Sequence, residues 1–134
     1  MSNQSGLFSI VQRGMSAQMI RMNTAASNLA NSGSVSSTQE GAYRPLRPVF
    51  EQELDRASGL SSVRVAEVRQ SDTAATRRHD PDHPLADANG DVWEAPVNES
   101  AEMVEIMESA RQYQNLVDAM QTAKQLMLET IRSK

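Results

Sequence analysis

The sequence predicts an α+β fold in which long N- and C-terminal helices pair as a coiled-coil-like layer, with a small β-rich insert between them. Apart from Met1, every Met lies in two terminal segments whose apolar residues recur at spacings of three and four, as along a helix face. The middle has no Met but holds all five Pro and the only Trp. We therefore expect an N-terminal helix at 1–31, a β-rich insert with loops at 32–98 and a C-terminal helix at 99–134.

The first segment is predicted to be helical from Gly6 to Asn31. Its apolar spacing averages about 3.5 residues, the period that keeps one stripe facing a partner helix. The members of this stripe are Phe8, Val11, Met15, Met22, Ala25 and Leu29. Gly14 is expected to weaken the helix by about 1 kcal/mol relative to Ala. Asn28, Asn31 and Gly33 are stop signals.

The second helix is predicted from Glu99 to Arg132, with Asn98 as its N-cap. Glutamates gather near its start and basic residues near its end, an order that complements the helix dipole. Its apolar stripe consists of Met103, Ile106, Ala110, Tyr113, Val117, Met120, Met127 and Ile131, interrupted by Lys124.

The insert is predicted to consist of short strands and polar loops. An extended segment around 46–54 follows Pro45, and its prolines confine it to a sheet edge. Alternating residues at 63–68 predict a second strand, and Val92-Trp93 begins another after a two-residue turn at Asn89-Gly90. Residues 32–41 and 70–80 are expected to be loops, because they are rich in Ser, Thr, Gln and charge.

Composition excludes several functions. With no Cys, the chain has neither disulfides nor thiolate chemistry. The net charge of −4 and the lack of a large basic patch make nucleic acid an unexpected partner. No stretch approaches the roughly 20 apolar residues that span a bilayer, so direct membrane insertion is not expected. Residues 1–10 have no charged start or long apolar run, so we expect no cleaved signal peptide.

Catalytic and metal sites are weakly indicated. His79, Asp80, Asp82, His83 and Asp87 could bind a divalent metal, but a polar turn is the simpler interpretation. Glu102, Glu105 and Glu108 are interpreted as a solvated helix face. No nucleophile elbow or phosphate loop occurs, so we expect no enzyme activity, no metal and no cofactor.

The two stripes are the candidate functional surface. An isolated helix this narrow gains most of its stability from a partner, and flexible Met side chains suit several neighbours. Periodicity alone leaves a helix pair within one chain and a contact between subunits equally open. The residues predicted to form an assembly interface are Val11, Met15, Met22, Ala25, Asn28, Leu29, Asn31, Met103, Ile106, Ala110, Tyr113, Val117, Met120 and Met127. We further expect the first helix, and the end of the second, to be largely unfolded in the free monomer.

Several motifs resemble one protein family. The run from Thr24 to Asn31 resembles the N-terminal signature of the rod, hook and hook-associated axial proteins of the bacterial flagellum. The segment from Asp80 to Gly90 resembles one of the small proximal rod subunits, as do Glu102-Met103-Val104, the run from Ala110 to Gln114 and Thr122-Ala123-Lys124. The chain departs from the family pattern at Asp91, where an aromatic residue is usual, and at Pro96-Val97-Asn98.

The resemblance implies a structural subunit of the proximal rod, the drive shaft that carries motor torque to the hook. It implies export by the flagellar type III apparatus without cleavage, and helical assembly with copies of itself and other rod proteins across the periplasm. The alternatives are another small axial rod subunit, a soluble helical adaptor and, least favoured, a metal-dependent enzyme.

Overall fold

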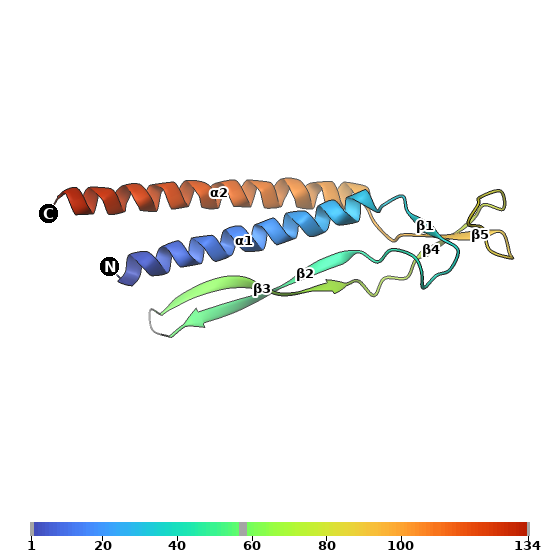
Figure 1. Ribbon diagram of the computed structural model, residues 1–134, viewed down its shortest axis with the longest axis horizontal. Coiled ribbons are helices and arrows are strands. Elements are labelled where there is room, and N and C mark those ends of the chain that lie inside the picture. The colour runs from blue at the N-terminus through green and yellow to red at the C-terminus, as the bar shows by residue number, and fades with distance from the viewer. Residues whose placement is uncertain (1, 57–58, 134) are drawn as a thin grey trace.

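A computed structural model describes residues 2–56 and 59–133. Helices α1 (Ser2–Ala30) and α2 (Glu99–Arg132) run antiparallel along the long axis, so both termini lie at one end of an elongated molecule (Figure 1). A long hairpin lies along α1 on the side away from α2, and a second small sheet lies beyond the other end of the helices. The predicted α+β fold, with two terminal helices and a small β insert, is confirmed.

The second helix begins and ends where the sequence predicted. Asn98 has extended backbone angles, and its Oδ1 accepts a hydrogen bond of 3.0 Å from the Ala101 N–H. This bond satisfies one of the orphan donors of the first turn and stabilises the helix start by about 1 kcal/mol. The first helix starts earlier than predicted, at Ser2, and ends at Ala30.

Small residues bring the two helices together. Val11, Ala17 and Ala25 are buried on α1. A Cβ at Gly14 would lie 3.1 Å from Leu116 Cδ1 of α2, which is tighter than ordinary packing. From the sequence, Gly14 was expected only to weaken the helix. The structure shows that the absence of a side chain at Gly14 leaves space for the Leu116 side chain.

The hairpin consists of β2 (Leu46–Asp55) and β3 (Leu60–Gln70), as predicted for the first two strands. The antiparallel register shifts between Val49, opposite Glu67, and Phe50, opposite Val65. The extra residue is Ala66, which makes a bulge that bends the ribbon. With only two strands both are edges, so Pro48 is tolerated in β2.

The end sheet has the order β1-β5-β4 and is antiparallel throughout. Its strands are β1 (Val35–Ser36), β4 (Thr76–His79) and β5 (Asp91–Glu94). The strand at Val92-Trp93 is confirmed, but the expectation of loops throughout 32–41 and 70–80 was wrong, because each holds a short strand that pairs with β5. The sequence did not predict β1 and β4 because their residues are mostly polar. Of the residues in this sheet, only Val92 of the central strand β5 is fully buried.

The turn before β5 differs from the predicted two-residue turn. Gly90 has φ of +78°, but Asn89 has no positive φ, and residues 80–90 connect β4 to β5. The Asp87 carboxylate accepts hydrogen bonds of 2.9 Å from the N–H groups of Asn89 and Asp91, and the Gly90 N–H donates to the Asp87 carbonyl. An Asp side-chain turn followed by one left-handed Gly therefore replaces the two-residue hairpin.

Candidate assembly interface

Most residues of the two predicted stripes are buried or partly buried within the single chain. Val11, Ala25 and Asn28 are buried, and Met103 and Ala110 are exposed. The others are partly buried: Met15, Met22, Leu29, Asn31, Ile106, Tyr113, Val117, Met120 and Met127. The interior of the single chain thus uses many residues that the sequence assigned to intersubunit contact.

The stripe predicted on α2 is out of phase by about one residue at its start. Glu102 and Ser109 face the interior and are 1% and 0% exposed, whereas Met103 is 53% exposed. The Ser109 hydroxyl donates 2.7 Å to the Glu105 carbonyl of its own helix, so it is buried with a partner. Apolar spacing selected Met103 and Ala110 instead, because it counts only apolar residues.

Asn28 joins α1 to the start of β2. Its Oδ1 accepts hydrogen bonds of 2.8 Å from the Leu46 N–H and from the Tyr43 hydroxyl, and its Nδ2 donates 2.9 Å to the Leu46 carbonyl. The Ser27 hydroxyl lies 3.1 Å from the same Tyr43 hydroxyl. The family signature on α1 therefore has an intrachain role that its sequence did not reveal.

Asn31 bonds its own helix. Its Nδ2 donates 2.8 Å to the Ser27 carbonyl in the last turn, which also accepts a bond of 3.1 Å from the Asn31 backbone N–H. Both side chains therefore satisfy backbone groups of their own chain near the end of α1: Asn28 bonds those of Leu46, and Asn31 bonds that of Ser27.

Arg21 pairs with two of the three glutamates that the sequence interpreted as a solvated face. Its Nε and Nη2 donate 2.8 and 2.9 Å to the Glu105 carboxylate, and Nη2 lies 3.5 Å from Glu108 Oε2. The side-chain hydrogen bond from Arg21 is the main reason that the pKa of Glu105 is lowered; the same bond raises the pKa of Arg21. This pair joins α1 to α2.

Glu102 is the clearest exception to the solvated-face interpretation. Arg47 Nη2 of β2 lies 2.7 Å from Glu102 Oε1, while within the described part of the chain Glu102 Oε2 has no hydrogen-bond partner. A buried carboxylate oxygen without a donor is costly. Glu102 lines a surface groove together with residues of α1 and β2, so a donor from another molecule can approach it through that groove.

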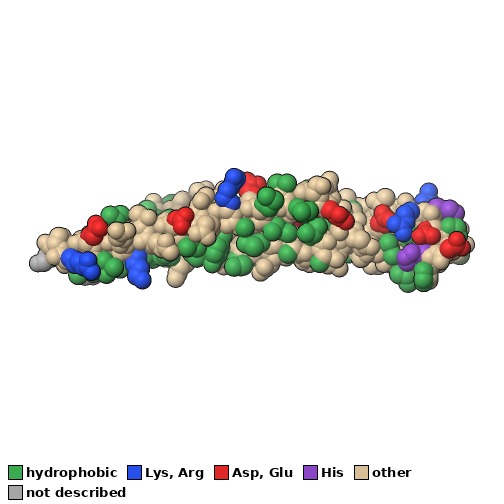
Figure 2. Space-filling view, turned by 90° about the horizontal axis from the view of Figure 1, so that it is seen from above, with side chains coloured by type: hydrophobic (Ala, Val, Ile, Leu, Met, Phe, Trp, Pro, Cys, Tyr) green, Lys and Arg blue, Asp and Glu red, His purple; other side chains and the backbone are tan. Residues whose placement is uncertain are grey.

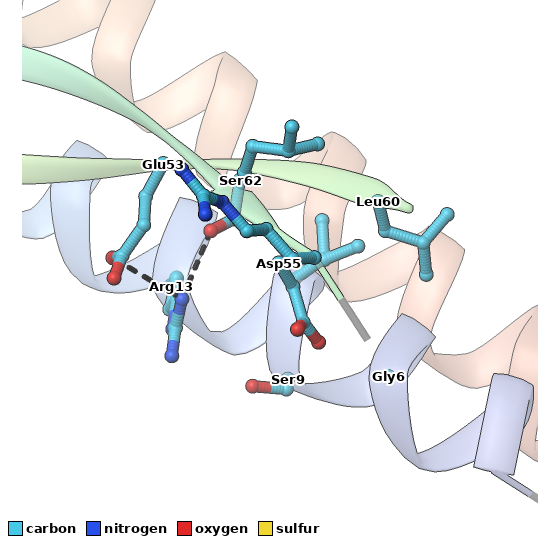
Figure 3. Close-up of a pocket in the computed structure, with 10 residues that line it drawn as sticks. Gly6, Ser9, Arg13, Glu53, Asp55, Leu60 and Ser62 are labelled. Carbon is cyan, nitrogen blue, oxygen red and sulfur yellow. Dashed lines mark hydrogen bonds and ion pairs between the residues drawn. The ribbon is translucent and has the colours of Figure 1, made fainter. Parts of the chain in front are cut away.

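Arg13, near the middle of α1, bonds the hairpin. Its Nη1 donates 3.0 Å to the buried Ser62 hydroxyl and lies 3.4 Å from Glu53 Oε2 (Figure 3). Gly6 and Leu60 lie close by and help to line a cavity of about 360 Å³ between the helix and the hairpin tip. Polar contacts thus attach the hairpin to α1 at Arg13, near the middle of the helix, and at Asn28, near its end.

The outer face of α2 carries exposed apolar residues that the predicted stripe missed. Val104 is 58% exposed and Met107 is 70% exposed. The view onto α2 shows hydrophobic side chains gathered over the middle of this face (Figure 2). A large exposed apolar patch marks an interaction site more often than isolated apolar residues do. The signal was present in the sequence, because Val104 and Met107 lie one turn apart.

Acidic and histidine residues at 79–91 form hydrogen bonds with one another and with the backbone of the end sheet and its loop. His79 Nδ1 lies 2.9 Å from Asp91 Oδ1, and His83 Nδ1 accepts a hydrogen bond from the Leu85 N–H. Among residues 2–56 and 59–133 no group of three or more His, Asp or Glu is placed to hold a metal ion. In the same ranges no helix is long and apolar enough to cross a membrane.

Comparison with known proteins identifies the family. Residues 9–33 match the family model described as flagella basal body rod protein, and residues 89–133 match the C-terminal model of the flagellar basal body rod FlgEFG proteins. The chain is 37% identical over 125 residues to the flagellar basal-body rod protein FlgC of Salmonella typhimurium, covering 93% of each chain. The chain belongs to the FlgC family.

Further FlgC proteins agree. That of Yersinia enterocolitica is 35% identical over 93% of each chain, and that of Agrobacterium fabrum is 32% identical over 91% of this chain and 88% of its own. The alignments span the end sheet as well as both helices. As a FlgC family member, the chain is a structural subunit of the flagellar basal-body rod, as the resemblance predicted.

Proposed function

We propose that this FlgC family chain assembles helically with copies of itself and with other rod proteins into the proximal rod, which transmits motor torque to the hook. The observation that carries this proposal is the exposed apolar surface on α2, since Val104 and Met107 lie on the outside of an already paired helix. Contacts between different surfaces of identical subunits produce an open helix when their rotation does not close.

The elongated layer suits this role. The described core consists of a few small or medium apolar residues, so the chain has more apolar surface to cover than it covers itself. Partly buried stripe residues such as Met22 and Leu29 are the proposed sites where neighbours complete the packing. The chain acts mechanically in this proposal, with no enzymatic step, and the flagellar type III export apparatus delivers it without cleavage.

Fractionation tests the proposal. A tagged copy that restores swimming to a strain lacking the gene is expected in purified basal bodies, at full length. Recovery only in the soluble fraction, together with normal basal bodies in the deletion strain, would instead support a soluble helical adaptor. Recovery at a different axial level of the rod would support another small rod subunit.

A further inference from the structure

A groove on the side of the molecule combines apolar walls with a buried carboxylate oxygen that has no donor in the described part of the chain. Its floor is α1, and α2 and β2 form its two sides. It has a volume of about 390 Å³ and is lined by Arg21, Thr24, Ala25, Arg47, Pro48, Phe50, Ala101, Glu102 and Glu105. We refer to these nine residues as the side groove.

One carboxylate oxygen of the side groove lacks a hydrogen-bond donor among the described residues. Arg21 is shared between Glu105 and Glu108, and Arg47 reaches only one oxygen of Glu102. Glu108 lies outside the nine residues, so within the side groove two guanidinium groups face two carboxylates. Glu102 Oε2 is buried and, in the described part of the chain, has no donor. A basic side chain entering the groove would supply the missing donor to this carboxylate.

The outer face of the same molecule carries a matching surface. Val104, Met107 and Arg111 follow one another at helical spacing and, with Glu108, line one surface hollow. We refer to Val104, Met107 and Arg111 as the outer ridge. Arg111 is exposed and makes no ion pair or hydrogen bond with any described residue.

The ridge and the groove cannot meet within one chain. Arg111 and Glu102 are nine residues apart, which is two and a half turns of about 3.6 residues, so they point to opposite sides of α2. A second copy can bring them together, with Val104 and Met107 against the exposed Phe50 ring and the other apolar walls. Because the two surfaces differ, each copy would offer one to the copy on either side, and the contact would repeat along a filament.

We propose that the outer ridge of one copy docks in the side groove of the next, with Arg111 of the first placed against Glu102 and Glu105 of the second. This inference rests on the proposed assembly into the rod and names a contact within it. The occupant is a second copy of this chain. Its ridge offers apolar side chains to the apolar walls of the groove, and it offers the Arg111 guanidinium, unpaired within the described ranges, to the Glu102 oxygen that has no donor there.

Cysteine pairs test the contact cleanly, because the natural chain has no Cys. The test pair is Phe50→Cys with Met107→Cys. The matched control is Phe50→Cys with Leu126→Cys, since Leu126 is also exposed (58%) on α2 but lies nineteen residues away, about 28 Å along the helix. Oxidation of purified basal bodies is expected to give dimers and higher oligomers with the test pair, at least tenfold above the control.

The outcomes separate the two proposals. If the chain is present in basal bodies but the test pair gives no more oligomer than the control, the ridge-in-groove contact is wrong and the rod assignment stands. If the untagged and tagged chains are absent from basal bodies, both proposals fail. Arg111→Glu gives a second readout without cysteines: we expect at least a tenfold loss of swimming cells, with Arg111→Lys retaining most of them and Arg132→Glu unchanged. Full motility of Arg111→Glu would overturn the contact.

Discussion

Asn28 on α1 bonds both backbone groups of Leu46 at the start of β2, accepting from its N–H at 2.8 Å and donating to its carbonyl at 2.9 Å. The Asn28 side chain thus supplies the hydrogen bonds that a neighbouring strand would otherwise make to the backbone of Leu46. A side chain that completes the backbone hydrogen bonds of a buried segment fixes its position as well as its stability. This relationship explains why the hairpin follows α1 instead of leaving it.

Asn28→Ala is expected to lower the free energy of unfolding by about 1–3 kcal/mol, because the Leu46 N–H loses its side-chain partner and the Leu46 carbonyl keeps only the 3.3 Å bond from Arg47. Urea denaturation followed by circular dichroism measures the change. Asn23→Ala, at an exposed site on the same helix, is the control and should change the midpoint little. Equal effects of the two variants would show that the Asn28 bonds do not stabilise the fold.

Gly14→Ile is expected to destabilise the chain by about 1–3 kcal/mol, because its Cβ would lie 3.1 Å from Leu116 Cδ1 and the rest of the side chain needs more room. Combining it with Leu116→Ala should recover part of that loss, and thermal melts of the four proteins of the cycle measure the coupling. Gly33→Ile is the comparison, since a Cβ there has no neighbour within 4 Å. Strictly additive effects at Gly14 and Leu116 would contradict the close approach of the two helices.

The Arg21–Glu105 pair is expected to give stability that is lost in acid. The pKa of Glu105 is lowered in the folded chain from its ordinary value of 4.5, chiefly by the hydrogen bond from Arg21. The contribution is therefore present above the ordinary value and disappears as the pH falls through the folded pKa. At neutral pH it should be below about 1 kcal/mol, since Glu105 is 41% exposed.

Unfolding midpoints of wild type and Arg21→Gln, measured from pH 7 to pH 3, test this dependence. The difference between the two proteins should shrink as the pH falls. Arg111→Gln should show no such trend, because Arg111 has no ion pair with any described residue. A difference that stayed constant or grew in acid would rule out the pair as its source.

The last turns of α2 are expected to be unfolded in the dilute monomer. The broader expectation, that the whole first helix is unfolded, assumed that α1 lacks an intrachain partner surface; that premise was wrong, because α1 lies between α2 and the β2–β3 hairpin. The last turns of α2 extend past the start of α1 and expose Leu126, Leu128 and Ile131. Hydrogen exchange should be fast at 124–133 and slow around Asn28, with protection of both in assembled rods. Uniform protection along both helices of the monomer would refute this.

Met22→Glu and Leu29→Asp are expected to abolish swimming while the protein is still exported. Both side chains are partly buried on α1, so a charge there faces apolar neighbours in the chain or in the assembled rod. Export into the medium and swimming in soft agar are measured together. Asn23→Asp, at an exposed site, should swim normally. Normal swimming of the Met22 or Leu29 variant would exclude an assembly role for that position.

The bounds of α2, its Asn98 cap and the two long strands followed from the sequence, because periodicity, capping and alternation depend on neighbours along the chain. The family followed from short motifs for the same reason. The burial of Glu102 did not, since a carboxylate becomes acceptable inside only when Arg47 arrives from another element. Nor did the bond from Asn28 to Leu46, which joins residues that are eighteen positions apart.

The sequence by itself determined that two amphipathic helices flank a β insert, because the spacing of apolar residues along each segment predicts which face of the helix is apolar. Only the tertiary structure decided what those faces meet. It placed much of each stripe against the other helix or the hairpin, turned Glu102 inward and left Val104 and Met107 outside. The physical reason is that spacing specifies a face, whereas the partner of that face depends on side chains brought together from distant parts of the chain.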